Sequence, residues 1–363
     1  MKNLTSNFLT KITEIFLQEK LPKRFAVAVS GGCDSLALAL LLKEFCDENK
    51  IELFAVTVDH KMRQGSSKEA LELGKILKKQ KISHQILEIN SEKIPQTNIE
   101  AKLREVRYDL LYSFCVKNKI KFLFLGHIQS DISENFLIRL FRGSGLDGLS
   151  SISEISDFKK IKLVRPLLDV TKDELKNYLQ ERNIKWFEDE SNKDEKFLRN
   201  KIRNFFEQFE EKNLIQKRIK TATDEIAKMR DLFDDLMLKE AKKILKLQNG
   251  FLTINLKKFA KTEQKIALKI LALVLMEVGE KSYKPRLEKL QRFYDFIVEN
   301  KNHKPRNFYG CMAKSFDESS LLIYNEKNPQ KKITEFKTIL KKILKQVQDD
   351  TEIGARTRLI PSS

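Results

Sequence analysis

The sequence is poor in cysteine and proline, and both scarcities exclude classes of protein. Its 363 residues include 4 cysteines and 7 prolines. The cysteines lie far apart and form no Cys-x-x-Cys pair, which argues against a zinc site, an iron–sulfur site or a disulfide framework. Few prolines, with a hydrophobic content of 41%, favour an ordered globular chain. We therefore expect a folded protein that works in the reducing cytoplasm.

Long hydrophobic runs are also absent. The longest, such as residues 36–42, are much shorter than the ~18 residues that a membrane-spanning helix needs. The N-terminus has no apolar stretch typical of a signal peptide. We expect a soluble cytoplasmic protein with no membrane partner, and its length favours two or three domains.

Negative charge is scarce in the C-terminal part. Residues 1–211 hold 36 Lys and Arg against 32 Asp and Glu, whereas residues 212–363 hold 33 against 19, so that +14 of the net charge of +18 lies there. A basic surface of this kind favours a polyanion, with nucleic acid ahead of an acidic membrane surface. A lysine-rich composition that reflects only an AT-rich genome and a solvated surface remains the alternative.

The N-terminal part alternates between apolar runs and amphipathic stretches. Strands are predicted at 25–29, 51–58, 82–89 and 121–125, and helices at 4–20, 35–48, 66–80, 98–118 and 131–142. Two pairs with capping-box spacing, Ser66 with Glu69 and Thr171 with Glu174, mark helix starts. Because near-continuous apolar strands are typical of parallel sheets, we expect an α/β fold with helices on both faces of the sheet.

The C-terminal part has a different pattern. Apolar residues recur every three or four positions from 215 to 236, which predicts one long amphipathic helix. A strand at 251–256, helices at 262–278 and 285–299, and a hairpin ending at 321–324 indicate a small α+β domain. We expect a catalytic domain over 1–210, a helical linker and basic domain over 211–327, and a poorly ordered lysine-rich tail over 328–363.

One turn, Ser30-Gly31-Gly32-Cys33-Asp34-Ser35, lies between the first predicted strand and the following helix. Two glycines allow close approach to an anion, and amides at the helix N-terminus can bind phosphate. The Asp34 carboxylate would repel phosphate unless a divalent cation lay between them. No lysine in the loop can reach a β- or γ-phosphate, so this is not a Walker A loop. The pattern favours a magnesium nucleotide, although an ordinary glycine-rich turn would have the same spacing.

Further polar residues follow the ends of other predicted strands. Asp59 and His60 follow the second strand, and His127 follows the fourth. One turn apart on the next helix lie Asp131 and Glu134. Ligands bind at the carboxyl ends of strands in such sheets, so these side chains are candidates for nucleotide contact and proton transfer. Helix capping is the competing interpretation for both aspartates.

Arginines form a second group of candidates. Glu100, Arg104 and Arg107 share one helical face, which is equally typical of a solvated salt-bridged stripe. Other basic candidates are Arg142 in a glycine-rich turn, Arg165 at the end of a strand, and the pair Arg199 and Arg203. Between these last groups, the only tryptophan precedes an acidic loop that would suit either solvent or a cationic amine substrate.

The order of these motifs resembles the bacterial tRNA(Ile)-lysidine synthetase family, which has the N-type ATP pyrophosphatase (PP-loop) fold. The matching pieces, strong over about residues 20–205, are Ser-Gly-Gly-x-Asp-Ser at 30–35, Asp-His at 59–60, Glu-Ala-x-x-Arg-x-x-Arg-Tyr at 100–108, Gly-His at 126–127, Asp131, Glu134, Arg-Gly-Ser-Gly-Leu at 142–146, Arg-Pro-Leu-Leu at 165–168, Trp-x-Glu-Asp-x-Ser-Asn at 186–192 and Arg-Asn-x-x-Arg at 199–203. Ser130 stands where the family commonly has Asp.

The resemblance implies that ATP adenylates the C2 carbonyl oxygen of cytidine 34 in tRNA(Ile) with a CAU anticodon, and that L-lysine then displaces AMP. It implies that the loop from Ser30 to Ser35 binds the pyrophosphate with Asp59 and His60, and that Asp34 holds Mg²⁺. Arg107 and His127 would steady phosphate charge, while Asp131 and Glu134 would bind or deprotonate the lysine ammonium. The substrate contacts implied are Glu100, Arg104, Arg142, Arg165, Arg199 and Arg203.

Two alternatives remain open from the sequence. A tRNA thiolase would use a cysteine pair or a persulfide carrier, and the missing Cys-x-x-Cys counts against it. A nucleotide-sensing RNA-binding protein without catalysis would not require Asp34, His127 and Asp131 together. The sequence does not decide whether the chain forms a homodimer.

Overall fold

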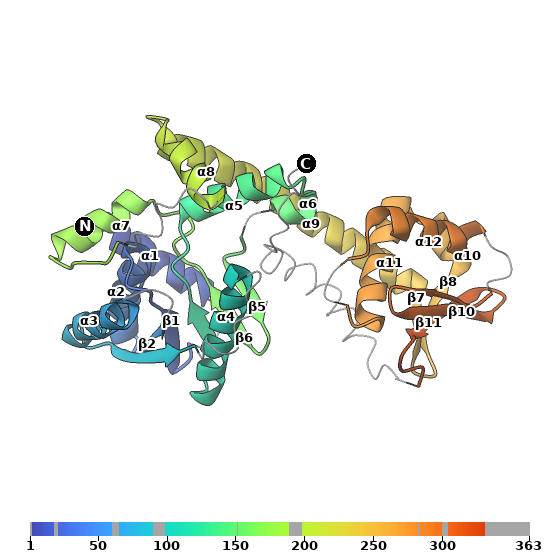
Figure 1. Ribbon diagram of the computed structural model, residues 1–363, viewed down its shortest axis with the longest axis horizontal. Helices are drawn as coiled ribbons and strands as arrows, with labels where there is room; N and C mark the ends of the chain where they lie inside the picture. Colours follow the sequence, from blue (N-terminus) through green and yellow to red (C-terminus); the bar gives the residue numbers. More distant parts are fainter. Residues whose placement is uncertain are drawn as a thin grey trace. The chain divides into compact units, whose positions relative to one another are not determined.

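The structure, a computed structural model, describes residues 2–17, 21–59, 65–89, 99–150, 152–188, 198–281, 284–299 and 304–330 (Figure 1). The chain divides into two compact units, with the division between Ala227 and Lys228. It falls inside one long helix, α9 (Lys212–Ile244), which confirms the single amphipathic helix predicted there. Of the tail predicted over 328–363, residues 331–363 lie outside the described residues.

The first unit is built on a six-stranded sheet. Its strands are β1 (Arg24–Ala28), β2 (Glu52–Asp59), β3 (Ser83–Glu88), β4 (Phe122–Phe124), β5 (Ile155–Phe158) and β6 (Ile161–Val164). They lie in the order β3-β2-β1-β4-β6-β5, and every neighbouring pair is parallel except the antiparallel edge pair β5 and β6. The carboxyl ends of β1, β2, β4 and β6 therefore meet at one edge.

Helices cover both faces of this sheet (Figure 1). One face packs against α1 (Lys2–Ile15), α2 (Cys33–Glu48), α3 (Ser66–Lys79) and α7 (Lys172–Glu181), and the other against α4 (Ile99–Lys117). Alternation along β1 explains the two cores, because Phe25 and Val27 join the first while Ala26 and Ala28 join the second. The predicted α/β fold is confirmed.

The first unit contains three more helices, α5 (Gln129–Phe141), α6 (Leu146–Leu149) and α8 (Leu198–Glu207).

One of the two predicted capping boxes is confirmed. The Thr171 hydroxyl accepts from the backbone N–H of Glu174, and the Glu174 carboxylate accepts from the backbone N–H of Thr171. The other is wrong. Helix α3 is preceded by Gly65 in the left-handed region, and the Ser66 hydroxyl donates instead to Asp59 at 2.8 Å.

The second unit is an antiparallel sheet with helices. Its strands are β7 (Leu245–Gln248), β8 (Phe251–Asn255), β9 (Arg306–Phe308), β10 (Cys311–Asp317) and β11 (Ser320–Asn325), in the order β7-β8-β11-β10-β9. The end of α9 packs with α10 (Leu256–Lys261), α11 (Gln264–Val278) and α12 (Leu287–Glu299) around one core. The predicted small α+β arrangement is present. No helix among the described residues is long and apolar enough to cross a membrane.

Candidate active site

The glycine-rich turn joins β1 to α2, as predicted, and its serines close it internally. The Ser35 hydroxyl accepts from the backbone N–H of Ser30 at 3.1 Å and lies 3.2 Å from both the Gly32 carbonyl oxygen and the Ser30 hydroxyl. Ser35 is buried, whereas Ser30 is exposed. The Ser35 side chain therefore holds the shape of the loop, and the Ser30 hydroxyl is the more accessible of the two to a ligand.

Two glycines let other segments approach this loop. At Gly31, which has φ +87°, an added Cβ would lie 2.7 Å from the ring of Phe187, whose N–H donates to the Gly31 carbonyl at 3.0 Å. At Gly126, directly after β4, an added Cβ would lie 3.0–3.2 Å from backbone atoms of Ser35 and Asp34. Glycine therefore lets β4 end close to the start of α2 without displacing that backbone.

Asp34 lies in the first turn of α2, and one oxygen of its carboxylate has no hydrogen bond. Its Oδ1 atom is buried and has no hydrogen-bond partner. Burial is the main reason why the pKa of Asp34 is raised to about 6, with nearby Asp131 also raising it and Lys172 opposing the rise. Such a carboxylate gains stability from a cation. Asp34 therefore fits a Mg²⁺ ion, which commonly takes one or two protein carboxylates with its other ligands from nucleotide phosphates and water.

Asp34 does not belong to a larger described group of metal ligands. Across the described ranges, no three His, Cys, Asp or Glu side chains lie together as a metal site. The neighbouring Cys33 is buried, and burial raises the pKa of its thiol to about 12, so it remains protonated. Cys33 has no features of a reactive cysteine.

His127 follows β4, as predicted, and its Nδ1 atom is buried without a hydrogen-bond partner. Burial is the largest cause that lowers its pKa well below the ordinary value, and the further causes are the positive charges of Arg165, Arg104, Arg199 and Arg107. The imidazole is therefore neutral near pH 7, so that it can donate or accept a hydrogen bond but carries no charge.

Arg104 and Arg107, both on α4, lie near His127. The Arg104 guanidinium lies 5.2 Å from the ring centroid of Tyr108. Burial, with the nearby positive charge of Arg104, lowers the pKa of Arg107. No described carboxylate pairs with either arginine. Two arginines beside a neutral histidine form a cationic surface suited to phosphate.

Asp131 and Glu134, on α5, each bind an arginine from α8. Arg199 donates to Asp131 and to Glu134, both at 2.6 Å, and Arg203 donates to the second oxygen of Glu134 at 2.7 Å. The Glu134 side chain is 4% exposed. Asp131 also accepts from the backbone N–H of Ile128 at 2.9 Å, so it caps α5 as well. The four side chains form one network, and each carboxylate still has lone pairs for a further donor.

The other site residues predicted from the sequence range from buried to exposed, and the side chains of two lie outside the part of the structure that is described. Asp59 is buried at the end of β2 and accepts from the hydroxyls of Ser66 and Ser67 at the start of α3. His60 lies outside the described residues, as does the side chain of Glu100. Arg142 is exposed at the end of α5.

Arg165 is almost wholly buried after β6. Its guanidinium donates to the Ser153 carbonyl at 2.9 Å and to the Ser156 hydroxyl at 3.1 Å. These contacts anchor the edge strand β5, and the arginine adds positive charge beside His127.

Two residues near the loop were not predicted from the sequence. Lys172, the first residue of α7, is the strongest positive influence on Asp34. Gln129, the first residue of α5, is buried with its Oε1 atom unpartnered. A signal for Lys172 was present, because a lysine in the first turn of a helix is opposed by the helix dipole and invites another explanation.

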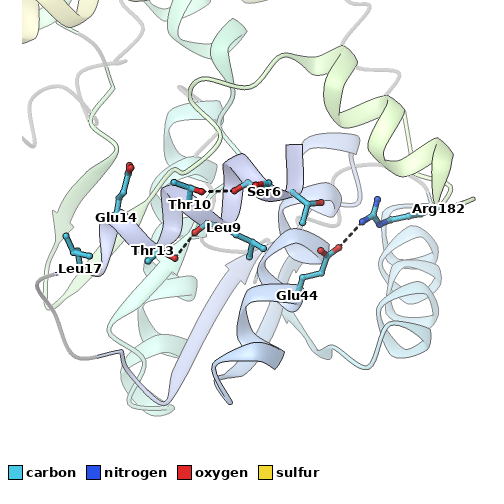
Figure 2. Close-up of a pocket in the computed structure, with 9 residues that line it drawn as sticks. Ser6, Leu9, Thr10, Thr13, Glu14, Leu17, Glu44 and Arg182 are labelled. Carbon is cyan, nitrogen blue, oxygen red and sulfur yellow. Dashed lines mark hydrogen bonds and ion pairs between the residues drawn. The ribbon is translucent and has the colours of Figure 1, made fainter. Parts of the chain in front are cut away.

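A cavity of about 650 Å³ lies away from this edge (Figure 2). It lies between α1 and two side chains, Glu44 of α2 and Arg182 directly after α7, which are joined by an ion pair of 2.9 Å. None of the predicted site residues lines it. The predicted site is therefore defined by its side chains at the edge of the sheet and not by this cavity.

Comparison with known proteins assigns the class first. Residues 4–209 match the model of the PP-loop domain family, so the first unit is a PP-loop domain of the kind that uses ATP. Among solved structures, a U34-tRNA thiolase from Methanococcus maripaludis is similar in fold, with a TM-score of 0.50 and 19% identity, over 61% of this chain and 78% of that one.

Curated relatives then identify the family. The tRNA(Ile)-lysidine synthase of Orientia tsutsugamushi is 33% identical over 332 residues, which cover 89% of this chain and 74% of that protein. The enzyme of the same name from Wolbachia pipientis is 33% identical over 303 residues, 82% of this chain and 70% of that protein. The chain belongs to the tRNA(Ile)-lysidine synthase family.

Proposed function

We propose that this protein ligates L-lysine to C2 of cytidine 34 in tRNA(Ile) with a CAU anticodon, through an adenylated cytidine. The observation that carries the proposal is the buried, unpartnered oxygen of Asp34, which lies in a phosphate-type loop of a PP-loop chain and suits a magnesium nucleotide. The charged side chains proposed for both half-reactions lie on two helices of the same unit: Arg107 on α4 near His127, and Asp131 and Glu134 on α5 near Asp34.

The first half-reaction makes the cytidine C2 reactive. The O2 oxygen attacks the α-phosphorus of ATP, and the bond to the bridging oxygen breaks with its electron pair leaving on pyrophosphate. Mg²⁺ held by Asp34 would neutralise charge on the phosphates. The loop amides and the Ser30 hydroxyl bind the leaving group, and Arg107 balances charge at the α-phosphate. His127 is neutral, so it contributes a hydrogen bond to phosphate and not a charge.

The second half-reaction needs an uncharged amine. The ε-ammonium of lysine binds at Asp131 and Glu134, which the guanidinium groups of Arg199 and Arg203 hold in fixed orientation. One carboxylate takes a proton from the ammonium, and the amine then attacks C2 and expels AMP. The charge of the network is balanced by its two arginines, so ammonium binding depends on the remaining carboxylate lone pairs or on displacement of an arginine.

The basic C-terminal part is the proposed tRNA-binding surface. In the second unit, α10 presents the exposed lysines Lys257, Lys258 and Lys261 on one short helix. None of them has a described ion-pair partner. When unpaired surface lysines neutralise phosphates, the cations condensed on the nucleic acid are released. Binding is therefore strong at low salt and weakens as salt is added.

The alternatives are weaker. A thiolase mechanism needs reactive sulfur, and the described cysteines are all buried with pKa values raised to about 12 by burial. Catalysis-free nucleotide sensing gives no account of the partly buried Asp131 and the buried Glu134, both of which lie close enough to Asp34 to raise its pKa.

The deciding assay incubates the protein with ATP, Mg²⁺, labelled lysine and tRNA(Ile) bearing a CAU anticodon. We expect label on the tRNA together with release of AMP and pyrophosphate. The same tRNA with another base at position 34 serves as control and should stay unlabelled. No label on the CAU transcript, with a known enzyme active in parallel, would refute the function. Light scattering on the same sample tests for a homodimer, which would have twice the mass of one chain.

A further inference from the structure

The glycine-rich loop lacks the lysine with which Walker A loops hold terminal phosphates. The leaving pyrophosphate nevertheless gains negative charge as the bond to the α-phosphorus breaks. Asp34 and Mg²⁺ alone leave much of that charge unbalanced. A cation from another part of the fold is therefore expected near the loop.

Lys172 lies at the same edge of the sheet as the loop. The segment from Arg165 to Lys172 leaves the carboxyl end of β6, whose neighbour β4 lies beside β1. Its backbone meets the start of α5, because the N–H of Gln129 donates to the Val170 carbonyl at 3.1 Å. Helix α7 also packs with α2 in one core. The fold thus brings the first residue of α7 next to the first turn of α2.

The side chain of Lys172 is available for a ligand. It is exposed, and no described carboxylate forms an ion pair with it. It is the cation that acts most strongly on Asp34, whose Oδ1 is buried and unpartnered. A lysine in the first turn of a helix is opposed by the helix dipole, so local stability does not explain its presence.

We propose that Lys172 binds the β- and γ-phosphates of ATP and the pyrophosphate they become, in the role that the loop itself leaves unfilled. This proposal rests on the proposed use of ATP at the same loop. It assigns to α7 a part in nucleotide binding that the glycine-rich motif does not reveal. The α-phosphate and the adenosine bind elsewhere and do not need Lys172.

The test compares ligands with and without terminal phosphates. Binding of Mg²⁺-pyrophosphate and of AMP to the full chain is measured by calorimetry for the wild type, Lys172→Met and Lys172→Arg. We expect Lys172→Met to weaken pyrophosphate binding about tenfold or more, as for loss of a charged hydrogen bond, while AMP binding changes less than about twofold. Lys172→Arg should keep most of the pyrophosphate affinity, because the charge remains.

The matched control is Lys176→Met, one turn further along α7, which should change pyrophosphate affinity less than about twofold. The proposal is wrong if Lys172→Met binds pyrophosphate like the wild type, if AMP affinity falls equally, or if the wild type does not bind pyrophosphate. None of these readouts needs tRNA or lysine. A clean pyrophosphate effect without lysidine formation would therefore leave Lys172 assigned and refute only the proposed function.

Discussion

The two units treat buried polar groups differently. In the first unit, Asp34, His127 and Gln129 each have a buried polar atom without a partner, and all three lie where β1 and β4 end. In the described part of the second unit one such atom is present, Oε1 of Gln248 in β7, whereas the buried Asp234 is paired with Lys269 of α11 at 2.6 Å. Unpaired buried groups lower stability, whereas the paired ones complete the core. Three unpartnered polar groups gathered at one edge of the sheet therefore suit a ligand in the first unit, whereas the Asp234–Lys269 pair completes the core of the second unit.

Asp34→Asn should have the largest effect and should change activity and stability in opposite directions. Loss of the carboxylate is expected to lower lysidine formation about a thousandfold or more. The folded state raises the pKa of Asp34 to about 6, so above that pH the charged carboxylate is unfavourable. The variant should gain up to about 3 kcal/mol in unfolding free energy at pH 8 without nucleotide. Calorimetry and the lysine assay measure both, and a destabilised variant would contradict this account.

Asp234→Asn in the second unit should lower stability and leave activity unchanged. It leaves the buried ammonium of Lys269 without its charged partner, which should lower the unfolding free energy by about 3 kcal/mol. Activity per folded molecule should remain near that of the wild type. Denaturant unfolding measures the free energy of unfolding of each variant. The control is Glu240→Gln, which removes a more exposed ion pair with Lys243 and should change the free energy of unfolding by less than about 0.5 kcal/mol. Equal losses would remove the contrast between the units.

Replacing Lys257, Lys258 and Lys261 with glutamine should weaken tRNA binding about tenfold at low salt and flatten its salt dependence. Stability should not change, because these side chains are exposed. The matched control replaces Lys75, Lys78 and Lys79, exposed on α3 of the first unit. Filter binding at several salt concentrations measures both. If the control replacement weakens tRNA binding as much, the lysines of the second unit do not form a dedicated tRNA-binding surface.

His84 offers the smallest test, on the pH dependence of the first unit. Its Nε2 lies 2.8 Å from the Thr57 hydroxyl, which donates to the Val29 carbonyl just before the loop. Burial lowers the pKa of His84, so the stability due to the neutral ring is present above pH 6.5 and is lost as the pH falls below it. His84→Gln should therefore reduce the acid sensitivity of unfolding. Parallel curves for both proteins would contradict the assignment.

Much of the fold could be predicted because its signals are local. The apolar runs located β1, β2 and β3 within about two residues, since buried strands need continuous apolar sequence. Strand β5 was missed, because Ile-Ser-Asp-Phe is short and half polar. The pair Ser66 and Glu69 located the start of α3 but not the contact of its serine, because the Ser66 hydroxyl donates to Asp59, whose position only the sheet determines.

The contacts of the candidate site were less predictable. Asp131 and Glu134 were singled out, but their arginines come from a helix about 65 residues later in the chain. No local spacing connects the two pairs. The burial of Arg165 also depended on β5, the strand that was missed. Residue types at strand ends indicated where chemistry would occur, while the partners of each side chain needed the three-dimensional structure.

Gly126 has a consequence for recognising such proteins in genome sequences. A methyl group there would press on backbone atoms of Ser35 and Asp34, which cannot rotate aside as a side chain can. A glycine after the fourth strand, about ninety residues beyond the loop, is therefore a second feature to look for beside the glycine-rich turn itself. Because this glycine comes from a different segment, it separates the arrangement from a chance glycine-rich turn better than the loop motif does alone.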